Sequence, residues 1–333
     1  METKVQVKFF NQLLQRFPRK ADAVEELSTT LNLSRDAVYR RLRGDTLLTP
    51  DELLDLAKRY RISLDGLALG DSDLVFFSYN TFTNPVKNLT NWLGSIHTDI
   101  KRVMQAPDAH IFYASLEIPV FHYLFFPNLL AFKFYVWGKT SWQLDFLKNR
   151  PFSFDLLTPN DERIANNILD NYLRLPTTEL WSLNIADHTL NQIEYTLLSG
   201  NFTNQEAAKT LCEQLLQLVQ HERAMATAGS KFRLGQTAEE LSADFNLFHN
   251  EIVHTNNTFL VKTAVGNTVY TTLSNPNFLQ STDPRLCANI ENWFQNIIAQ
   301  SNSISRHSAK SRGWFFSGLE RKIEATMKRI ELF

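Results

Sequence analysis

The 333-residue chain has only two cysteines, Cys212 and Cys287, and they lie far apart in the sequence. No disulfide framework and no paired-cysteine zinc motif is visible, which favours a reducing compartment. No apolar run reaches about eighteen residues, and the N-terminus lacks the apolar core of a signal peptide. We therefore expect a cytoplasmic protein without a membrane-spanning segment.

The sequence also lacks the common motifs of catalytic and cofactor sites. Neither glycine-rich phosphate loop is present, and the H-E-x-x-H zinc helix and the G-x-S-x-G nucleophile turn are absent too. His249 and His254 flank Glu251, but on a strand this spacing puts the two rings on opposite faces, which disfavours a metal site. We predict no cofactor, no metal and no enzymatic activity.

With 44% hydrophobic and 21% charged residues, the chain has the composition of a globular protein. Its net charge of −1 conceals an uneven distribution. Residues 1–61 carry twelve Lys and Arg against nine Asp and Glu, and residues 301–333 carry seven against three. The remaining residues carry fifteen against twenty-three. A basic N-terminal part joined to an acidic body is consistent with a DNA-binding module attached to something that is not one.

The first seventy residues contain several short amphipathic helices. Apolar residues recur every three or four positions over 5–17 and 21–31, which predicts two helices. After a turn at 32 and 33, Ser34 can cap a third helix over 34–43. The sequence TPDE from Thr49 is a capping box with proline at the first helical position, and it predicts a further helix to about residue 60.

The helix over 34–43 contains four arginines and one acid, a net charge of +3. A helix of this width fits the major groove of DNA, where arginine can pair with guanine. We predict base contacts from the residues near its start and phosphate contacts from the later arginines. The predicted base contacts are Arg35 and Tyr39, and the predicted phosphate contacts are Arg40, Arg41 and Arg43. The alternative is a solvated cationic face on an ordinary helical bundle.

The sequence VEELSTTLNLSRDAVYRRLRGDTLLTPDELLDLAKRYRISLDGLAL resembles the Cro/repressor-type (XRE-like) helix-turn-helix transcriptional regulators. The resemblance covers roughly Val5 to Leu69, about a fifth of the chain. It implies that 34–43, capped by Ser34, is the recognition helix and that the domain binds double-stranded DNA, usually as a dimer. The family often has glycine in the turn, where this chain has Asn32, a residue that tolerates the left-handed conformation.

The rest of the chain alternates between strand and helix patterns. We expect a hinge and a linker helix over 71–105, with a short strand at 75–79, and the pattern over 178–200 fits a strand or a helix. Predicted strands at 109–118, 245–253, 259–265 and 268–273 alternate with predicted helices at 128–142, 161–173, 203–228, 283–300 and 311–332. The expected class is α+β overall: an all-α helix-turn-helix domain over 1–70, followed by a larger mixed α/β domain over 106–333 for effector sensing and dimerisation.

Two stretches are candidates for effector binding. Eight of the seventeen residues from Phe121 to Trp137 are aromatic, which is typical of a core. The alternative is an aromatic pocket for a planar or apolar ligand, with Glu117, His122 and Lys133 as its polar groups. Near the C-terminus, Lys310 and Arg312 lie at the start of the last predicted helix and would suit an anionic ligand. The alternative there is a solvated basic tail, or one that attracts DNA without specificity.

The sequence SNPNFLQSTDPRLCANIENWFQNIIAQS is similar to the closing strand and helix of phospholipase-D-like domains, some of which are ligand sensors on transcriptional regulators. The catalytic sites of that family have a His and a Lys separated by one residue. None of the eight histidines here has a Lys two positions later. The resemblance therefore implies a catalytically inactive sensor domain.

Together these features predict a one-component transcriptional regulator that is a homodimer and binds double-stranded DNA. Its binding would be modulated by a small-molecule effector or by oligomerisation of the C-terminal domain. The alternative is a protein-interaction or enzymatic module whose helical N-terminal domain binds protein and not DNA. The sequence does not identify the operator, the effector or the direction of regulation.

Overall fold

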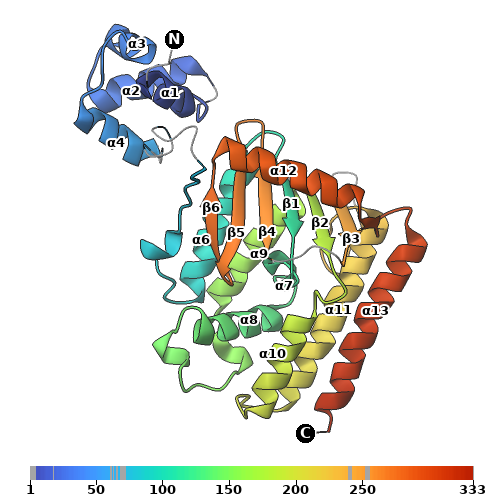
Figure 1. The fold of residues 1–333 in the computed structure, drawn as a ribbon. Helices are drawn as coiled ribbons and strands as arrows, with labels where there is room; N and C mark the ends of the chain where they lie inside the picture. The colour runs from blue at the N-terminus through green and yellow to red at the C-terminus, as the bar shows by residue number, and fades with distance from the viewer. Residues whose placement is uncertain are drawn as a thin grey trace. The chain divides into compact units, whose positions relative to one another are not determined.

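The computed structural model of the chain describes residues 5–17, 19–60, 62, 64, 67, 73–238, 242–251 and 256–332. They form two compact units (Figure 1). The head comprises Met1–Phe77 with Ser281–Leu286, and the body comprises Ser78–Gln280 with Cys287–Phe333. The N-terminal region is helical and the body contains helices and a mixed seven-stranded sheet, which confirms the predicted α+β class.

The helices of the head that lie within described residues are α1 (Val5–Leu14), α2 (Lys20–Leu31), α3 (Arg35–Arg43) and α4 (Pro50–Tyr60). These bounds confirm the predicted helices to within a few residues. The apolar stripes of the four helices meet in one core, which includes Phe9, Phe10, Leu13, Val24, Leu27, Val38, Leu42 and Leu56. The short element predicted after residue 63 falls largely outside the described residues.

The turn between α2 and α3 has the local geometry that the sequence predicts. Asn32 has a φ of 52°, in the left-handed region, and ends α2. Ser34 caps α3 because its side chain accepts a hydrogen bond from the backbone N–H of Ala37 at 3.3 Å. Before α4, the backbone N–H of Thr49 donates to Glu52 Oε2 at 2.8 Å, and the backbone N–H of Glu52 donates to Thr49 Oγ1 at 3.2 Å. This exchange is the predicted capping box.

Gln6 on α1 connects that helix to the end of α3 and to the loop that follows. Its Nε2 donates to the carbonyl oxygens of Arg41 and Thr46, at 2.7 and 2.8 Å. Its Oε1 accepts from the backbone N–H of Leu48 at 2.8 Å. One amide side chain thus satisfies three backbone groups beyond the helix and fixes the end of α3 against α1.

The body is built on a seven-stranded sheet in the order β6-β5-β4-β1-β2-β3-β7. The central strands β1, β2 and β3 are parallel, whereas β4 runs antiparallel to β1 and β7 antiparallel to β3. The strands are β1 (His110–Ala114), β2 (Thr177–Trp181), β3 (Phe245–His249), β4 (Thr258–Lys262), β5 (Thr268–Ser274), β6 (Asn277–Ser281) and β7 (Asn302–Ser303).

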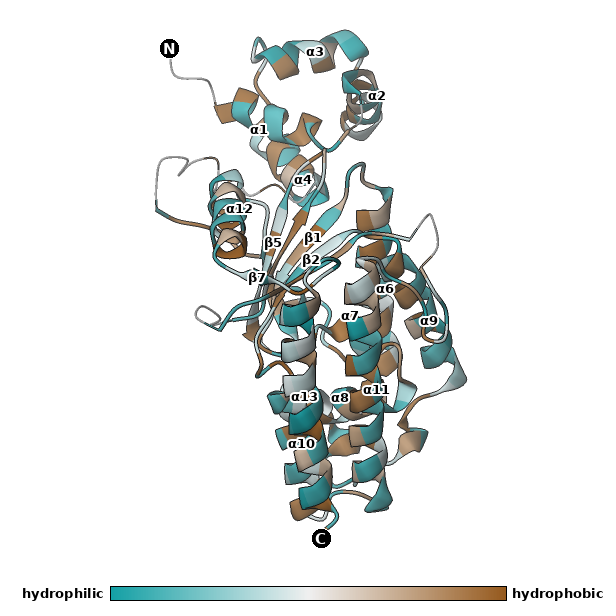
Figure 2. Ribbon diagram, turned by 90° about the vertical axis from the view of Figure 1, so that its right-hand side faces the viewer, coloured by the Kyte–Doolittle hydropathy of each residue, from teal (hydrophilic) through white to brown (hydrophobic). Residues whose placement is uncertain are grey.

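Helices cover both faces of this sheet. In Figures 1 and 2, α12 lies on one face and α6, α7 and α9 lie on the other. The helices are α6 (Leu89–Gln105), α7 (Val120–Tyr123), α8 (Pro127–Thr140), α9 (Pro159–Leu173), α10 (Asp187–Leu198), α11 (Glu206–Ala228), α12 (Pro284–Ala299) and α13 (Ala309–Ile330). Of the described helices, none is both long and apolar enough to cross a bilayer.

Three features of the body differ from the sequence predictions. The segment 178–200, which fitted a strand or a helix, contributes to both β2 and α10. The strand predicted at 75–79 is only an isolated bridge between Ser78 and Gln280. The predicted linker helix is α6, but its side chains Leu89, Trp92 and Leu93 are buried in the core of the body. Because α6 buries its apolar face against α9, it belongs to the body, and the boundary lies near residue 77.

Candidate functional site

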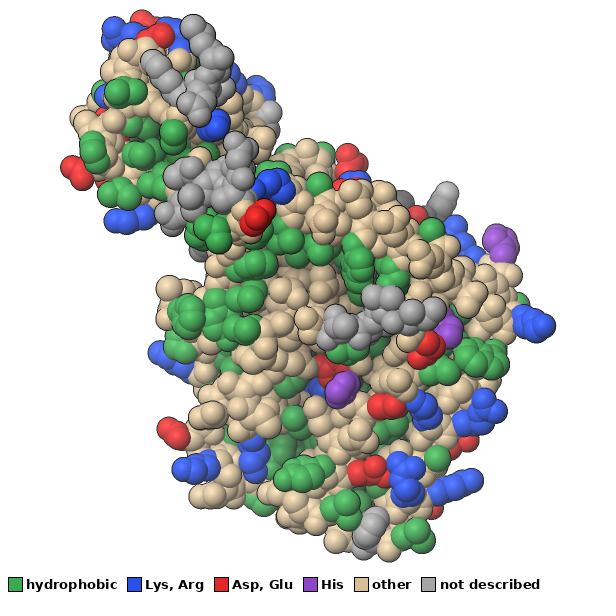
Figure 3. Space-filling view, in the orientation of Figure 1, with side chains coloured by type: hydrophobic (Ala, Val, Ile, Leu, Met, Phe, Trp, Pro, Cys, Tyr) green, Lys and Arg blue, Asp and Glu red, His purple; other side chains and the backbone are tan. Residues whose placement is uncertain are grey.

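Helix α3 presents a cationic face to solvent. Val38 and Leu42 anchor the helix in the core of the head, whereas Arg35, Arg40 and Arg43 are exposed. Figure 3 shows Lys and Arg side chains at the edge of the head that α3 forms. Three of the four predicted arginines therefore lie on a surface that a ligand can reach.

The exposed arginines make few contacts with the rest of the head, and those contacts are between exposed groups. Arg40 has no ion pair or hydrogen bond from its side chain to any part of the chain that the structure describes. Arg35 lies 3.6 Å from Glu25, and their side chains are 68% and 72% exposed. Arg43 Nε donates to Asp45 Oδ2 at 2.8 Å, again between exposed groups. Exposed ion pairs of this kind contribute little free energy, so these arginines can exchange their partners for phosphates.

Arg41 is in a different environment from its neighbours. Its side chain is only 13% exposed, and its guanidinium donates to Glu52 Oε1 at 3.1 Å. The same Glu52 carboxylate completes the capping box of α4, so the pair joins α3 to α4. This position differs from the phosphate contact predicted for Arg41, because the guanidinium faces the head's own interior.

Tyr39, in the middle of α3, lies beside Lys20 at the start of α2. Tyr39 is partly buried against the core of the head, and Lys20 Nζ lies 5.9 Å from the centroid of its ring. Lys20 is the first residue of α2 and is exposed. Lys20 was not among the residues predicted from the sequence, although a basic residue at the start of the helix before the turn was a usable signal. The surface therefore comprises Lys20, Ser34, Arg35, Tyr39, Arg40 and Arg43, which we call the α3 surface.

In the body, the structure brings together two of the predicted effector-binding residues. Lys133 Nζ donates to Glu117 Oε2 at 2.8 Å and to Gln192 Oε1 at 2.8 Å. The other Glu117 oxygen accepts from the side-chain amide of Asn275. Lys133 is fully buried and Glu117 is 5% exposed, so the two charges form an internal ion pair rather than open ligand groups.

His122 belongs to a different buried cluster and has no exposed surface. Its Nε2 lies 3.0 Å from Glu179 Oε2 on β2. Its Nδ1 lies 2.6 Å from Glu222 Oε1 on α11, a close contact of charges in which the N–H does not point at the oxygen. Tyr172 Oη and Trp181 Nε1 also donate to Glu179, at 2.5 and 2.9 Å. The predicted role of His122 as an effector ligand is thus replaced by a role in the core.

The charges of this cluster shift each other's pKa values. Burial alone lowers the pKa of His122, but the carboxylates of Glu222 and Glu179 outweigh it and raise that pKa to about 10. Burial raises the pKa of Glu179, but the neighbouring His122 charge outweighs it and holds that pKa below its usual value. Lys231 Nζ donates to the carbonyl of Tyr172, and burial lowers the pKa of this lysine to about 7.

The two cations predicted near the C-terminus lie elsewhere. Lys310 is exposed, whereas Arg312 is 8% exposed and donates to the carbonyl oxygen of Arg306 at 2.8 Å. Arg306 in turn binds Asp244, which precedes the amino end of β3. Glu117 instead follows the carboxyl end of β1. The strands β1, β2 and β3 are parallel, so the carboxyl end of β1 and the amino end of β3 lie at opposite edges of the sheet. The predicted effector residues therefore lie at opposite ends of the parallel strands and do not form one site.

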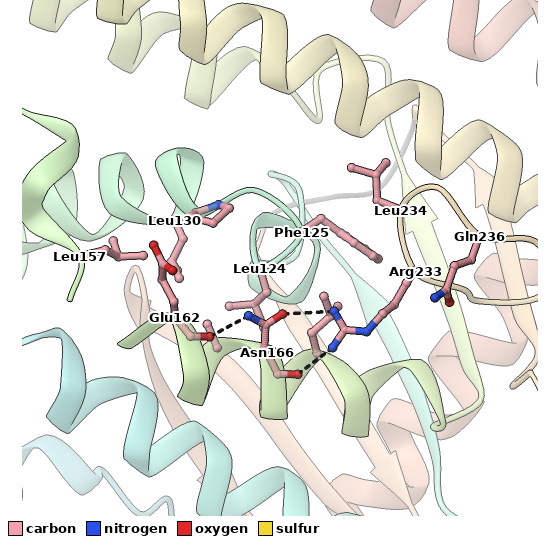
Figure 4. Close-up of a pocket in the computed structure, with 12 residues that line it drawn as sticks. Leu124, Phe125, Leu130, Leu157, Glu162, Asn166, Arg233, Leu234 and Gln236 are labelled. Atoms are coloured by element: carbon pink, nitrogen blue, oxygen red, sulfur yellow. Dashed lines mark hydrogen bonds between the residues drawn. The ribbon is translucent and has the colours of Figure 1, made fainter. Parts of the chain in front are cut away.

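A pocket of about 150 Å³ lies between α9 and the segment around Arg233 (Figure 4). Leu124, Phe125 and Leu130 supply much of its apolar wall. Arg233 at its edge is already bound to Asp170 at 2.6 Å and to Asn166 at 3.1 Å. This volume is below the usual range of roughly 300–1,000 Å³ for ligand sites. Within the described residues, no group of three or more His, Cys, Asp or Glu could hold a metal ion.

In comparisons with protein families, curated proteins and solved structures, nothing matches this chain.

Proposed function

We propose that the protein is a transcriptional regulator whose head binds double-stranded DNA through α3. The observation that supports this most is the exposed row of Arg35, Arg40 and Arg43 on a capped helix that follows a three-residue turn. In a helix-turn-helix, the second helix enters the major groove while the first crosses the backbone. The buried residues of α3 hold it to the head, which leaves its cationic side for the duplex.

The positions along α3 divide the proposed contacts into two kinds. Arg35 begins the helix and Tyr39 lies about one turn later, at its middle, and we assign both to base edges, which recognition helices reach from their amino-terminal part. Arg40 and Arg43 lie toward its carboxyl end and would neutralise phosphates. Lys20 begins α2, where the backbone N–H groups of a helix also favour phosphate. Arg41 is left out of the proposed interface because it is paired with Glu52.

The body would provide effector sensing and dimerisation. It has its own core and sheet, independent of the head. A homodimer would present two α3 helices to half-sites about 34 Å apart, and an effector would change how well both fit. Sedimentation of the purified chain tests the dimer directly, and a monomer at micromolar concentration would contradict this part of the proposal.

The DNA contact can be tested with the double variant Arg40→Ala, Arg43→Ala. A matched control is Arg174→Ala, Arg321→Ala, since both of these arginines are exposed on the body and their side chains have no partner within the described part of the chain. Binding to a selected duplex is measured by fluorescence anisotropy across salt concentrations. Each lost phosphate contact should reduce the slope of log K against log salt by about 0.9, or about 1.8 per head for the double variant.

The control removes the same charge and should keep the parent's slope. If the α3 variant binds DNA with the parent's affinity and slope, the assignment of α3 is wrong. If neither parent nor control shows any salt-dependent DNA binding, the head binds protein or has another role, and the regulator proposal fails.

A further inference from the structure

The carboxyl ends of the three parallel strands open onto a polar cleft of about 420 Å³ in the body. Its lining comes from residues that follow each strand, with Leu116 after β1, Ser182 after β2 and Glu251 after β3, and from the first turns of α10. In open α/β sheets, ligands bind at the carboxyl ends of the strands, where connecting loops supply side chains and backbone groups. The volume falls within the usual range of ligand sites.

The geometry points to this cleft as the binding site for a small, uncharged, polyhydroxylated molecule of the sugar or polyol class. This inference rests on the proposed function and names the chemical class of the effector. It concerns the body alone, so it can be tested without DNA.

The cleft offers hydrogen-bonding groups that are not used elsewhere. His188 and Asn191 lie three residues apart on α10, so they share one side of the helix, and both are exposed. Within the described residues, neither side chain has a hydrogen-bond partner. The Ser182 oxygen accepts from the backbone N–H of Asn184 and keeps its own hydrogen to donate. The amide of Asn191, the imidazole of His188 and the hydroxyl of Ser182 together supply both donors and acceptors. Neighbouring hydroxyl groups on one ligand can bind to both kinds.

The charges around the cleft disfavour an anionic ligand. Its lining contains two carboxylates and no Lys or Arg. Asp187 is paired with Lys322 at 3.0 Å, and Glu251 lies 2.6 Å from His249 Nε2 and accepts from the backbone N–H of Leu183 at 2.6 Å. With no Lys or Arg on the lining and both acids already engaged, an added anion would find no lysine or arginine to pair with, and a neutral ligand would disturb no ion pair. This differs from the anionic effector expected from Lys310 and Arg312.

The cleft also has a rigid polar support. Glu117 follows the lining residue Leu116, and Gln192 follows Asn191 on α10. Both bind the buried Lys133, so one ammonium group links the β1 end to α10. The segment of α10 that carries His188 and Asn191 is therefore tied to the end of β1 through Gln192, Lys133 and Glu117.

The test uses the purified full chain with labelled histidine rings, and His188→Gln identifies the signal of His188 in the NMR spectrum. The probes are glucose, ribose, mannitol and inositol, with phosphate, citrate and putrescine as charged comparators. We expect at least one sugar or polyol to shift the His188 signal saturably and to raise the melting temperature. Asn191→Ala should weaken this binding at least tenfold, whereas Asn296→Ala, on an exposed asparagine of α12, should leave it unchanged.

The inference is overturned if no sugar or polyol moves the His188 signal, or if Asn191→Ala binds as the parent does. It is also overturned if phosphate, citrate or putrescine binds at His188 more tightly than every neutral probe. Any of these results leaves the DNA measurements on the α3 surface untouched, so the two proposals can fail separately.

Discussion

Replacing His122 with phenylalanine tests the charge cluster at the centre of the body. The change removes the cation that lies between two fully buried carboxylates, 3.0 Å from Glu179 and 2.6 Å from Glu222. Breaking a buried ion pair from one side costs about 3–5 kcal/mol, because the remaining charge is left without a partner. At about 2–4 °C per kcal/mol, the melting temperature of the body should fall by roughly 6–20 °C.

Tryptophan fluorescence can follow this change in the body alone, because all six tryptophans lie there. His122→Phe combined with Glu222→Leu should recover part of the loss, since it also removes the carboxylate that has no aligned hydrogen bond. His188→Phe, at an exposed position, is the control and should change stability by less than about 0.5 kcal/mol. A His122→Phe protein as stable as the parent would refute the reasoning.

The pH dependence has a definite sign. Because the folded pKa of His122 is raised to about 10, its stabilisation is complete below the unfolded value of roughly 6.5 and is lost as the pH rises through the folded value. The difference in unfolding free energy between the parent and His122→Phe should therefore shrink between pH 6.5 and 10. A difference that grows over this range would contradict the assignment of a protonated His122.

Three further predictions follow from particular residues. Burial lowers the folded pKa of Lys231 to about 7. The parent should therefore gain stability relative to Lys231→Met as the pH rises from about 7 to 10, measured by urea unfolding. If the difference in unfolding free energy between the two proteins did not change over this range, the prediction would be refuted. Gly138→Ala would place its Cβ against the buried Leu147 side chain and should destabilise the body by about 1–3 kcal/mol. Gly94→Ala, whose Cβ would meet nothing within 4 Å, should stabilise it by roughly 0.5–1 kcal/mol, and equal melting temperatures of the two variants would contradict this. Glu52→Ala removes the partner of Arg41 and the half of the capping box that accepts from the Thr49 N–H, so hydrogen exchange of the α4 amides should show a loss of about 1–2 kcal/mol. The exposed Glu25→Ala should show none.

The head could be predicted from sequence because its signals are local. A cap, a turn residue in the left-handed region and a reciprocal Thr49–Glu52 pair each act over four residues or fewer. The same short range limited the prediction for Arg41. Arg40 and Arg41 are consecutive, so their side chains point about 100° apart around α3. The loop after α3 then brings Glu52 to Arg41 alone.

The polar interior of the body could not be predicted in this way. Glu179 lies in the sequence TTELW, whose first three residues are polar, yet all five residues of β2 are buried. Its partners His122 and Glu222 come from other elements, more than forty residues away on either side. For the same reason Glu117, His122 and Lys133 resembled the polar groups of one pocket, although the fold places them in two separate buried pairings.

Selection from a library of randomised duplexes with the purified 333-residue chain tests most directly whether α3 recognises DNA sequence. The account predicts that bound duplexes share a short motif, and that Arg35→Ala and Tyr39→Ala relax the preference at particular positions by about 1–3 kcal/mol. Recovered duplexes as random as the starting library, or a motif unchanged by both substitutions, would contradict it.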